Sequence, residues 1–513
     1  MPRPLRVLAK DRETGWGFTA LLCVPYLVFL IWMHLHHEMW RDEVHSWTLA
    51  RLAQSFGELV TGDRAYEGHP PLWFWYLHVW SWLTKEAWGI QAATIAAGWG
   101  ASVLLVRFAP FPRYLKLLLL CSFYISYEYT VMCRNYVLGW FLLCLFCALY
   151  HPVRVRYWAL GVAIALLSLT SVYGLLMALC LLGFFVLDNT RLSRTAAGGP
   201  ATPPTVAAIA SPRLVAALAL AGLAIVFCAV TLQPPDPNPF SRDWFFGGLN
   251  QGAIPDALQR FAAGYVPLRP VSPAFWISSI FPTGGEDNVL VWIVGGGLAL
   301  LSLAALYPSW RLMLTYLIAV GTMQFFQITR YRGDPRHWGH YFIFLVAATW
   351  LLRTTFPRRR YVLSTLLLVT MLGFQVESFV AATVGDSEAV FSGGRQTAGF
   401  IRRSHLQDLP IVAGPDWFVI TVTGYLGRPF ISVETEEVND TVVFHSRRRG
   451  FSTRALIDRA VQISRERKTP VLAISNQPLP EPTVPGARAE WLFTSKPGTL
   501  GDEIFSVYRV VAF

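Results

Sequence analysis

Residues 17–47 read GFTALLCVPYLVFLIWMHLHHEMWRDEVHSW, an apolar stretch that ends in a short polar and charged run. The apolar part, residues 17–33, has about the length of a helix that crosses a bilayer. No small-residue cleavage site follows it, so we expect an uncleaved anchor rather than a removed signal peptide. Asp42 and Glu43 then lie where the chain leaves its first span. We interpret this stretch as one wall of an active site at the membrane surface.

The composition of the whole chain is that of a polytopic membrane protein. Of its 513 residues, 54% are hydrophobic and only 15% are charged, whereas about a quarter of the residues in soluble proteins are charged. The net charge of +11 does not indicate a nucleic-acid partner, because Lys and Arg gather in the cytoplasmic loops of membrane proteins. The seven cysteines lie in or beside apolar segments, and we expect them to pack as small apolar side chains.

The positions of Lys and Arg set the orientation of the predicted spans. The basic residues 1–15 should stay in the cytoplasm, which places Asp42 and Glu43 outside. The aromatic stretch Pro70–Leu83 is short for a span and rich in Trp and Tyr, so we expect a juxtamembrane helix on the outer surface. In total, we expect the chain to cross the membrane about eleven times, including the first span. The expected spans are residues 17–33, 88–106, 115–125, 136–149, 157–169, 174–187, 214–232, 289–306, 312–326, 341–352 and 362–380.

The chain divides into two predicted domains. Residues 1–384 form the membrane domain, and residues 385–513 form a smaller domain outside the membrane. The second domain alternates short β-like runs with a helical pattern, which is typical of an α/β domain. The β-like runs are 410–413, 442–444, 471–474 and 504–510, and the helical pattern covers 453–467. The predicted fold class is a polytopic α-helical membrane protein with outer juxtamembrane helices and a small extracytoplasmic α/β domain.

Polar side chains interrupt the apolar pattern at five places, all of which the predicted topology puts on the outer face. They are residues 41–43, 67–69, 128–134, 236–243 and 330–340. Arg332 and Arg336 lie outside against the positive-inside tendency, which suggests that they serve an anion. Ionisable residues near membrane spans are costly and therefore indicate function by default.

Each polar segment also has a purely structural interpretation. Adjacent acidic residues such as Asp42 and Glu43 are common on solvated loops. Glu128 and Arg134 could form an ion pair at a helix end, and the basic cluster at 332–340 could bind lipid headgroups. The His and Glu residues at 34–38 resemble a metal site, but their spacing does not put all of them on one helical face, so we expect an interfacial cap. The joint pattern is more informative than any single segment.

One reaction would use a carboxylate on an outer loop, a cluster of Arg and His, and an aromatic segment at the membrane interface together. That reaction is the transfer of a sugar from a polyprenyl-phosphate carrier, whose phosphate sits at headgroup depth. Arg and protonated His would neutralise the leaving phosphate, and the carboxylate would deprotonate the acceptor hydroxyl, which attacks the anomeric carbon from the opposite face. The sequence contains no Gly-rich nucleotide-binding fingerprint, as expected for a donor that is not a nucleotide sugar.

Three motifs carry a resemblance to a known family. They are Asp42-Glu43 after the first span, Gly68-His-Pro-Pro-Leu-Trp73, and Glu128 followed by Arg134-Asn-Tyr136. With them the chain resembles the GT-C superfamily of glycosyltransferases, in particular the protein O-mannosyltransferase and aminoarabinose transferase type. The resemblance covers roughly residues 1–187, with a weaker similarity at 332–340.

The resemblance implies an inverting glycosyltransferase with a polyprenyl-phosphate donor. In the superfamily the acidic residue of the first outer loop is the catalytic base, which corresponds to Asp42, with Glu43 beside it to orient or bind. The implied residues for donor phosphate and sugar are Glu67, His69, Glu128, Arg134, Tyr136, Arg332, Arg336, His337 and His340. His69 stands where some members have Lys, which leaves a direct phosphate contact open. The need for a divalent metal, Mg²⁺ or Mn²⁺, is also left open; Asp42 and Glu43 would hold it.

The remaining predictions concern partners, location and an alternative function. We expect contacts with membrane lipids, with the lipid-linked donor and with an acceptor that is a glycan, a lipid or a protein; Asp416, Tyr425 and Arg428 are candidates for its surface. The expected location is the bacterial inner membrane, with the N-terminus in the cytoplasm. The alternative is a transporter or lipid flippase, which predicts broken helices and mid-bilayer charges in paired halves. The nearly charge-free spans and the lack of an internal repeat favour the transferase.

Overall fold

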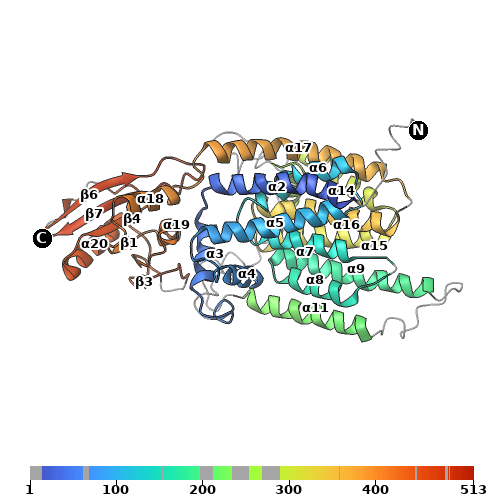
Figure 1. Cartoon of the computed structure of the whole chain (residues 1–513), viewed down its shortest axis with the longest axis horizontal. Coiled ribbons are helices and arrows are strands. Elements are labelled where there is room, and N and C mark those ends of the chain that lie inside the picture. Colours follow the sequence, from blue (N-terminus) through green and yellow to red (C-terminus); the bar gives the residue numbers. More distant parts are fainter. Residues whose placement is uncertain are drawn as a thin grey trace.

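The computed structural model describes most of the chain. The described residues are 14–61, 69–152, 154–196, 212–233, 253–267, 289–357, 359–444, 448–479, 483–484 and 486–513. Figure 1 shows a bundle of long helices joined at one end to a smaller domain that holds the C-terminus. The helices α3 (Arg41–Leu52) and α4 (Leu72–Trp80) lie at this same end.

Seven of the described helices are long and apolar enough to cross a membrane, so the chain is a multi-pass membrane protein. They are α2 (Trp16–His36), α5 (Trp88–Phe108), α9 (Val172–Ala196), α11 (Pro212–Thr231), α14 (Val289–Leu306), α15 (Trp310–Thr329) and α17 (Val362–Glu388). Each overlaps a predicted span. Three more helices coincide with predicted spans but are shorter or begin with a polar turn: α7 (Tyr136–Leu149), α8 (Tyr157–Ser168) and α16 (Pro335–Thr355).

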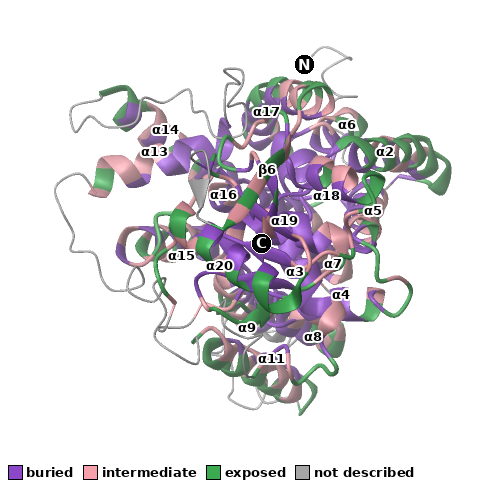
Figure 2. Ribbon diagram, turned by 90° about the vertical axis from the view of Figure 1, so that its left-hand side faces the viewer, coloured by how far each residue is buried: buried purple, intermediate pink, exposed green. Residues whose placement is uncertain are grey.

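The outer flanks of the bundle remain apolar where a soluble protein would be polar. Large hydrophobic side chains of α2 and α11, such as Leu21 and Leu223, are exposed. Figure 2 shows these exposed flanks around a buried interior. Exposed apolar faces of this kind suit contact with lipid chains rather than with water.

The span predicted at residues 115–125 is broken. The helix α6 (Arg113–Leu120) ends before Cys121, and a π-helix, η2 (Phe123–Glu128), follows. Two hydroxyl groups explain the break: Ser122 Oγ donates to the carbonyl of Leu119 at 2.8 Å, and Ser126 Oγ donates to that of Leu120. Both serines therefore bond carbonyl groups at the end of the helix and offer its backbone an alternative to the regular ladder.

The aromatic stretch at 70–83 forms α4, which is nine residues long and too short to cross a bilayer, as predicted. It packs beside α3, and His78 bonds the carbonyl of Ala50 through Nδ1 at 2.8 Å. The two short helices together form a shelf at the end of the bundle that faces the C-terminal domain (Figure 1).

The C-terminal domain is an α/β domain built on one seven-stranded sheet, with the order β3-β2-β1-β4-β7-β6-β5. Strand β1 is parallel to β2 and β4, and the other pairs are antiparallel. Helices α18 and α19 pack on one face and α20 on the other. The bounds are α18 (Gly394–Arg403), β1 (Ile411–Ala413), α19 (Asp416–Leu426), β2 (Phe430–Ser432), β3 (Val438–Asn439), α20 (Thr453–Arg467), β4 (Val471–Ser475), β5 (Thr483–Val484), β6 (Ala487–Thr494) and β7 (Ser506–Ala512).

The predicted strand at 442–444 is wrong, because these residues have no regular secondary structure. The Arg448 guanidinium donates to the carbonyl of Val443 at 3.0 Å. In a strand, this carbonyl would accept a hydrogen bond from a neighbouring strand instead. Strands β2, β3, β5 and β6 were not predicted. The other predicted strands and the helix at 453–467 are confirmed.

Polar bonds at the end of the bundle away from this domain join the segments that the prediction placed in the cytoplasm. Lys116 Nζ donates to the carbonyl of Val106 at 2.8 Å. Tyr150 donates to Asp188 at 2.6 Å, and Arg353 donates to Thr365 at 2.6 Å. The helix ends therefore form two groups, one that contains these polar contacts and one that faces the C-terminal domain.

Candidate active site

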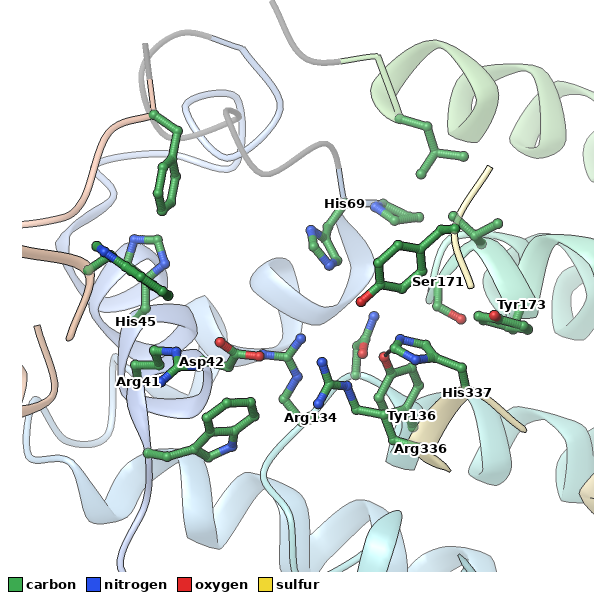
Figure 3. A pocket seen from close by; sticks show the side chains of 18 of the residues that line it. Arg41, Asp42, His45, His69, Arg134, Tyr136, Ser171, Tyr173, Arg336 and His337 are labelled. Carbon is green, nitrogen blue, oxygen red and sulfur yellow. Dashed lines mark hydrogen bonds and ion pairs between the residues drawn. The ribbon is translucent and has the colours of Figure 1, made fainter. Parts of the chain in front are cut away.

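A cavity of about 360 Å³ lies between the helix bundle and the C-terminal domain, within the usual size of a small-ligand site. One side, here called the bundle wall, is formed by Arg134, Tyr136, Tyr173, Arg336 and His337. The opposite side, the domain wall, is formed by Trp417, Ile420, Val442 and Phe444. The first residues of α3 lie between them. The predicted site residues that line the cavity are Asp42, His69, Arg134, Tyr136, Arg336 and His337 (Figure 3).

Four helices begin at this cavity. Arg41, Tyr136 and Val172 are the first residues of α3, α7 and α9, and Arg336 is the second residue of α16. The N-terminus of a helix carries a partial positive charge and unpaired N–H groups, so it attracts anions. Converging helix starts add to the charges of Arg134 and Arg336. The bundle wall is therefore suited to an anionic group.

Among the described residues, Asp42 is the carboxylate that lines the cavity. It lies in the first turn of α3, and its side chain is 28% exposed. Its Oδ2 contacts Nη1 of Arg134 at 2.9 Å. Arg134 follows the π-helix in the chain, so this pair joins two distant segments at the cavity. In Figure 3 Asp42 points toward Arg134, with Arg41 and His45 on its other side. A carboxylate held this way can accept a proton from a hydroxyl group bound beside it.

Glu43 is fully buried and does not line the cavity. Its carboxylate accepts the backbone N–H of Trp40 at 3.0 Å and that of Cys133. His37 Nε2 lies 3.1 Å from Glu43 Oε2. Glu43 thus fixes the start of α3 to the segment that carries Arg134. Its position three residues after the N-cap Trp40 is the one at which a glutamate closes a helix N-terminus.

His37 links this carboxylate to α17. Its Nδ1 lies 2.8 Å from Oδ2 of Asp386, which also accepts a hydrogen bond from Tyr127 at 3.0 Å. Burial lowers the pKa of His37, but the charges of Asp386 and Glu43 outweigh it and hold the pKa well above its ordinary value. The His37 imidazolium therefore links α3 to α17 through its contacts with Glu43 and Asp386.

The donor set for a divalent metal is not assembled at Asp42 and Glu43. The carboxylate oxygens of Glu43 bond backbone N–H groups and His37, while Asp42 pairs with Arg134. His34, from the cluster at 34–38, lies 3.0 Å from the carbonyl of Thr130. In the part of the chain that the structure describes, no three His, Cys, Asp or Glu residues gather as a metal site. These two carboxylates therefore do not fit the metal site that was considered for them.

Arg336 is the second cation of the bundle wall. Its side chain is 14% exposed and pairs with Asp334 at 2.9 Å. Its guanidinium lies over the ring of Trp40, 5.5 Å from the centroid. A planar guanidinium held by an aromatic face and a carboxylate is oriented before a ligand arrives, and it can bind a phosphate with two parallel bonds.

His337 and Tyr136 form a neutral hydrogen-bonded pair in the bundle wall. The backbone N–H of Asp334 donates to Nδ1 of His337 at 2.8 Å, so Nδ1 carries no proton. Nε2 then carries the proton and donates to Tyr136 Oη at 2.9 Å. This differs from the protonated histidine expected from the sequence. The consequence is that the Tyr136 hydroxyl can direct its own proton into the cavity.

Other predicted residues lie apart from the cavity lining. Glu128 is buried. His340 is also buried; its Nδ1 lies 3.1 Å from Tyr129 Oη, and its ring stacks on Tyr173 with 4.6 Å between centroids. Arg332 is exposed and pairs with Asp256 of α13 (Ala253–Tyr265) at 2.9 Å. Glu67 and the predicted polar segment at 236–243 lie outside the described residues.

The candidate acceptor residues of the C-terminal domain have other surroundings. Asp416 is buried in an ion cluster with Arg448. Tyr425 accepts the backbone N–H of Met39 at 2.9 Å and so joins the two domains. Arg428 lies 3.5 Å from Asp408, on the surface.

Several lining residues were not predicted. His45 lies one turn after Asp42 on the same face of α3, a spacing that would have identified it. Ser171 lies at the turn between α8 and α9, which the predicted topology placed on the outer face, and Tyr173 is the second residue of α9. Trp417 and Phe444 lie in a separate domain, and no pattern near them in the sequence indicates a cavity.

Comparison with known proteins rests on structure. No protein-family model and no curated protein sequence matches the chain. The crystal structure of ArnT from Cupriavidus metallidurans bound to undecaprenyl phosphate superposes with a TM-score of 0.53 and 14% sequence identity, over 97% of this chain and 98% of that one. The arabinofuranosyltransferase AftD from Mycobacteria gives a TM-score of 0.42 and 13% identity, over 98% of this chain and 40% of that one. ArnT is a GT-C glycosyltransferase, and its fold extends over nearly the whole of both chains. The chain therefore has the fold of the GT-C glycosyltransferases.

Proposed function

We propose that this protein is an inverting glycosyltransferase, which moves a sugar from a polyprenyl-phosphate donor to an acceptor hydroxyl outside the membrane. The observation that carries this proposal is one cavity that holds Asp42 together with Arg134 and Arg336. A solved protein of the same fold, ArnT, is bound to undecaprenyl phosphate. That likeness supports a lipid phosphate as the ligand of the bundle wall.

The proposed reaction is a single displacement at the anomeric carbon. Asp42 accepts the proton of the acceptor hydroxyl as its oxygen forms the new glycosidic bond. The bond between the anomeric carbon and the phosphate oxygen breaks, and its electron pair leaves with the polyprenyl phosphate. Attack from the face opposite the phosphate inverts the anomeric configuration.

Charge increases at the phosphate during this reaction. The donor is a phosphodiester with one negative charge, and the product monoester gains a second as the bond breaks. Arg134, Arg336 and the converging helix starts lie where they would stabilise that added charge. The Tyr136 hydroxyl would add a neutral donor. Leu232 and Phe326 line the cavity as well and give the prenyl chain an apolar side on which to lie.

The position of the polar groups favours this proposal over a transporter. The lining residues of the bundle wall lie at or just before helix starts, at one end of the bundle, rather than midway along the helices. A transport site is expected near the middle of the membrane. We further propose that the cavity end faces out of the bacterial inner membrane, because the opposite end carries the basic contacts of Lys116 and Arg353.

The test is transfer by the purified full chain in lipid nanodiscs, with a panel of polyprenyl-phosphate hexoses and pentoses and membrane extracts as acceptors. Asp42→Asn should lower transfer by about 10²- to 10⁴-fold, the usual contribution of a general base. Asp458→Asn is the matched control, since Asp458 is an exposed aspartate paired to Arg454 on α20. Full activity of the Asp42 variant would reject Asp42 as the base. Absence of sugar transfer or donor cleavage with every donor would reject the proposed function.

A further inference from the structure

The two walls of the cavity differ in charge. Every described residue of the domain wall, Trp417, Ile420, Val442 and Phe444, is apolar or aromatic. Arg134 and Arg336 of the bundle wall contact Asp42 and Asp334 respectively. One side of the cavity therefore has two arginines, and the described residues of the other side are apolar or aromatic.

The arginines beside the domain wall are each held by two carboxylates. Arg41 contacts Asp502 at 3.0 Å and Glu503 at 3.2 Å. Arg448 contacts Asp416 and also Glu434, the latter at 3.5 Å. Asp502 offsets the charge of Arg41 and Asp416 offsets that of Arg448, so neither guanidinium offers an unmatched charge to an anionic ligand.

The ion pairs also hold the aromatic rings of the domain wall in place. The Arg448 guanidinium lies 5.1 Å from the ring centroid of Phe444 and bonds the carbonyl of Val443. The Arg41 guanidinium lies 5.0 Å from the ring of Trp417, which packs against Phe418 with 3.9 Å between centroids. Rings held in this way offer a rigid surface, so little entropy is lost when a ligand binds.

The proposed reaction assigns a separate role to each wall. An inverting displacement needs the acceptor on the face of the sugar opposite the leaving phosphate. With the phosphate at the bundle wall and Asp42 between the walls, the acceptor must lie at the domain wall. Figure 3 shows Arg41 and His45 on one side of Asp42, and Arg336 and His337 on the other.

Resting on the proposed function, we infer that the domain wall is the acceptor subsite and that its ligand is an uncharged saccharide. The C–H face of a sugar ring packs on Trp417 and Phe444, as apolar groups pack on aromatic faces. His45, one turn after Asp42, lies where it can bond a hydroxyl of the same ring. An acceptor with phosphate groups would find its cationic partners already neutralised, and its desolvation would go uncompensated.

Binding can be measured without turnover. Ligand-observed NMR with the full chain in nanodiscs would compare neutral oligosaccharides with the same sugars carrying a phosphate. Neutral oligosaccharides should bind, and Trp417→Ala or Phe444→Ala should weaken them about tenfold, the upper value for one aromatic contact. Trp491→Ala is the matched control, because Trp491 is an exposed tryptophan on β6 of the same domain. Tighter binding of the phosphorylated sugars would overturn the inference.

Kinetics separate this inference from the proposed function. Trp417→Ala and Phe444→Ala should raise KM for the saccharide acceptor about tenfold and leave KM for the donor unchanged. Trp417→Phe should recover most of the loss, which also separates contact from misfolding. Equal losses for donor and acceptor, or anionic lipid or protein as the better acceptor, would overturn the inference alone. Absence of donor cleavage together with intact saccharide binding would count against the proposed transferase and not against the subsite.

Discussion

The bundle wall and the domain wall face each other across one cavity but are built by different means. The bundle wall consists of helix starts whose dipoles and arginines point to the same place. The domain wall consists of apolar and aromatic side chains on an irregular segment and on α19, and the arginines beside it, Arg41 and Arg448, pair with acidic side chains. In the proposed reaction, Asp42 lies between a site for the leaving phosphate and a site for a neutral acceptor.

Among the substitutions that test the difference between the two walls, one in the bundle wall should lower sugar transfer the most. Arg336→Ala should lower transfer by about 10²- to 10³-fold, because a donor to the developing anion is lost. It should also weaken binding of polyprenyl phosphate alone, measured by thermal stabilisation in nanodiscs. Arg448→Ala, which removes an arginine beside the domain wall, should leave polyprenyl phosphate binding unchanged. Equal loss of binding in the two variants would remove the proposed difference between the walls.

The next effect separates two adjacent carboxylates. Glu43→Gln should lower the free energy of unfolding by about 3 kcal/mol, because the buried imidazolium of His37 loses a charged partner. Asp42→Asn should leave it nearly unchanged, since Asp42 is partly exposed and its pair is worth about 0–1 kcal/mol. Thermal melting in detergent, followed by near-ultraviolet circular dichroism, compares the two. A loss as large for the Asp42 variant would assign Asp42 a structural role.

A smaller effect is expected from the neutral donor of the bundle wall. Tyr136→Phe removes a hydroxyl that bonds His337 and can reach the cavity. One neutral hydrogen bond contributes about 1 kcal/mol, so transfer should fall about five- to tenfold. His337→Gln, which keeps a side-chain donor near Tyr136, should cost less than the Tyr136 variant. A larger loss for the His337 variant would mean that the imidazole itself contacts the substrate.

The smallest expected effect is on stability and concerns the contact of Arg41, the first residue of α3, with Asp502 and Glu503 of the C-terminal domain. Burial raises the pKa of Glu503 to about 7, although Arg41 beside it acts in the opposite direction. The folded chain therefore holds this proton more tightly than the unfolded chain. The contribution of the group to stability is full below about pH 4.5 and is lost as the pH rises through about 7.

Melting temperatures between pH 5 and pH 8 check this sign. The wild type should lose stability relative to Glu503→Gln as the pH rises across that window, because the glutamine cannot ionise. Arg41 and Asp502 are the other charged groups of this contact. A difference between the two proteins that stays constant, or that grows in favour of the wild type, would contradict the raised pKa.

The bundle and one wall of the cavity could be predicted because their signals are local. Apolar length alone identified the seven long helices that could cross a membrane. Asp42, Arg134 and Arg336 stood out as charges beside apolar segments. The choice between Asp42 and Glu43 was harder, because adjacent side chains on a helix point in different directions. Which of them faces the cavity depends on how the helix packs in the folded protein.

The domain wall could not be predicted for a different reason. Trp417 and Phe444 reach the cavity because α19 packs on α3, where Gly424 lies against Val44 so closely that a Cβ would come within 2.2 Å of its side chain. Such a contact depends on how two domains dock. The break at Ser122 was missed as well, because the segment 115–125 is apolar enough to pass for a continuous span.

The stereochemistry of transfer tests the central claim most directly. With a polyprenyl-phosphate sugar of known anomeric configuration, proton NMR of the product reads the configuration of the new bond. The proposed single displacement, with Asp42 as base between the two walls, predicts complete inversion. Retention would contradict the account, because it would require a covalent intermediate and a nucleophile in place of the base.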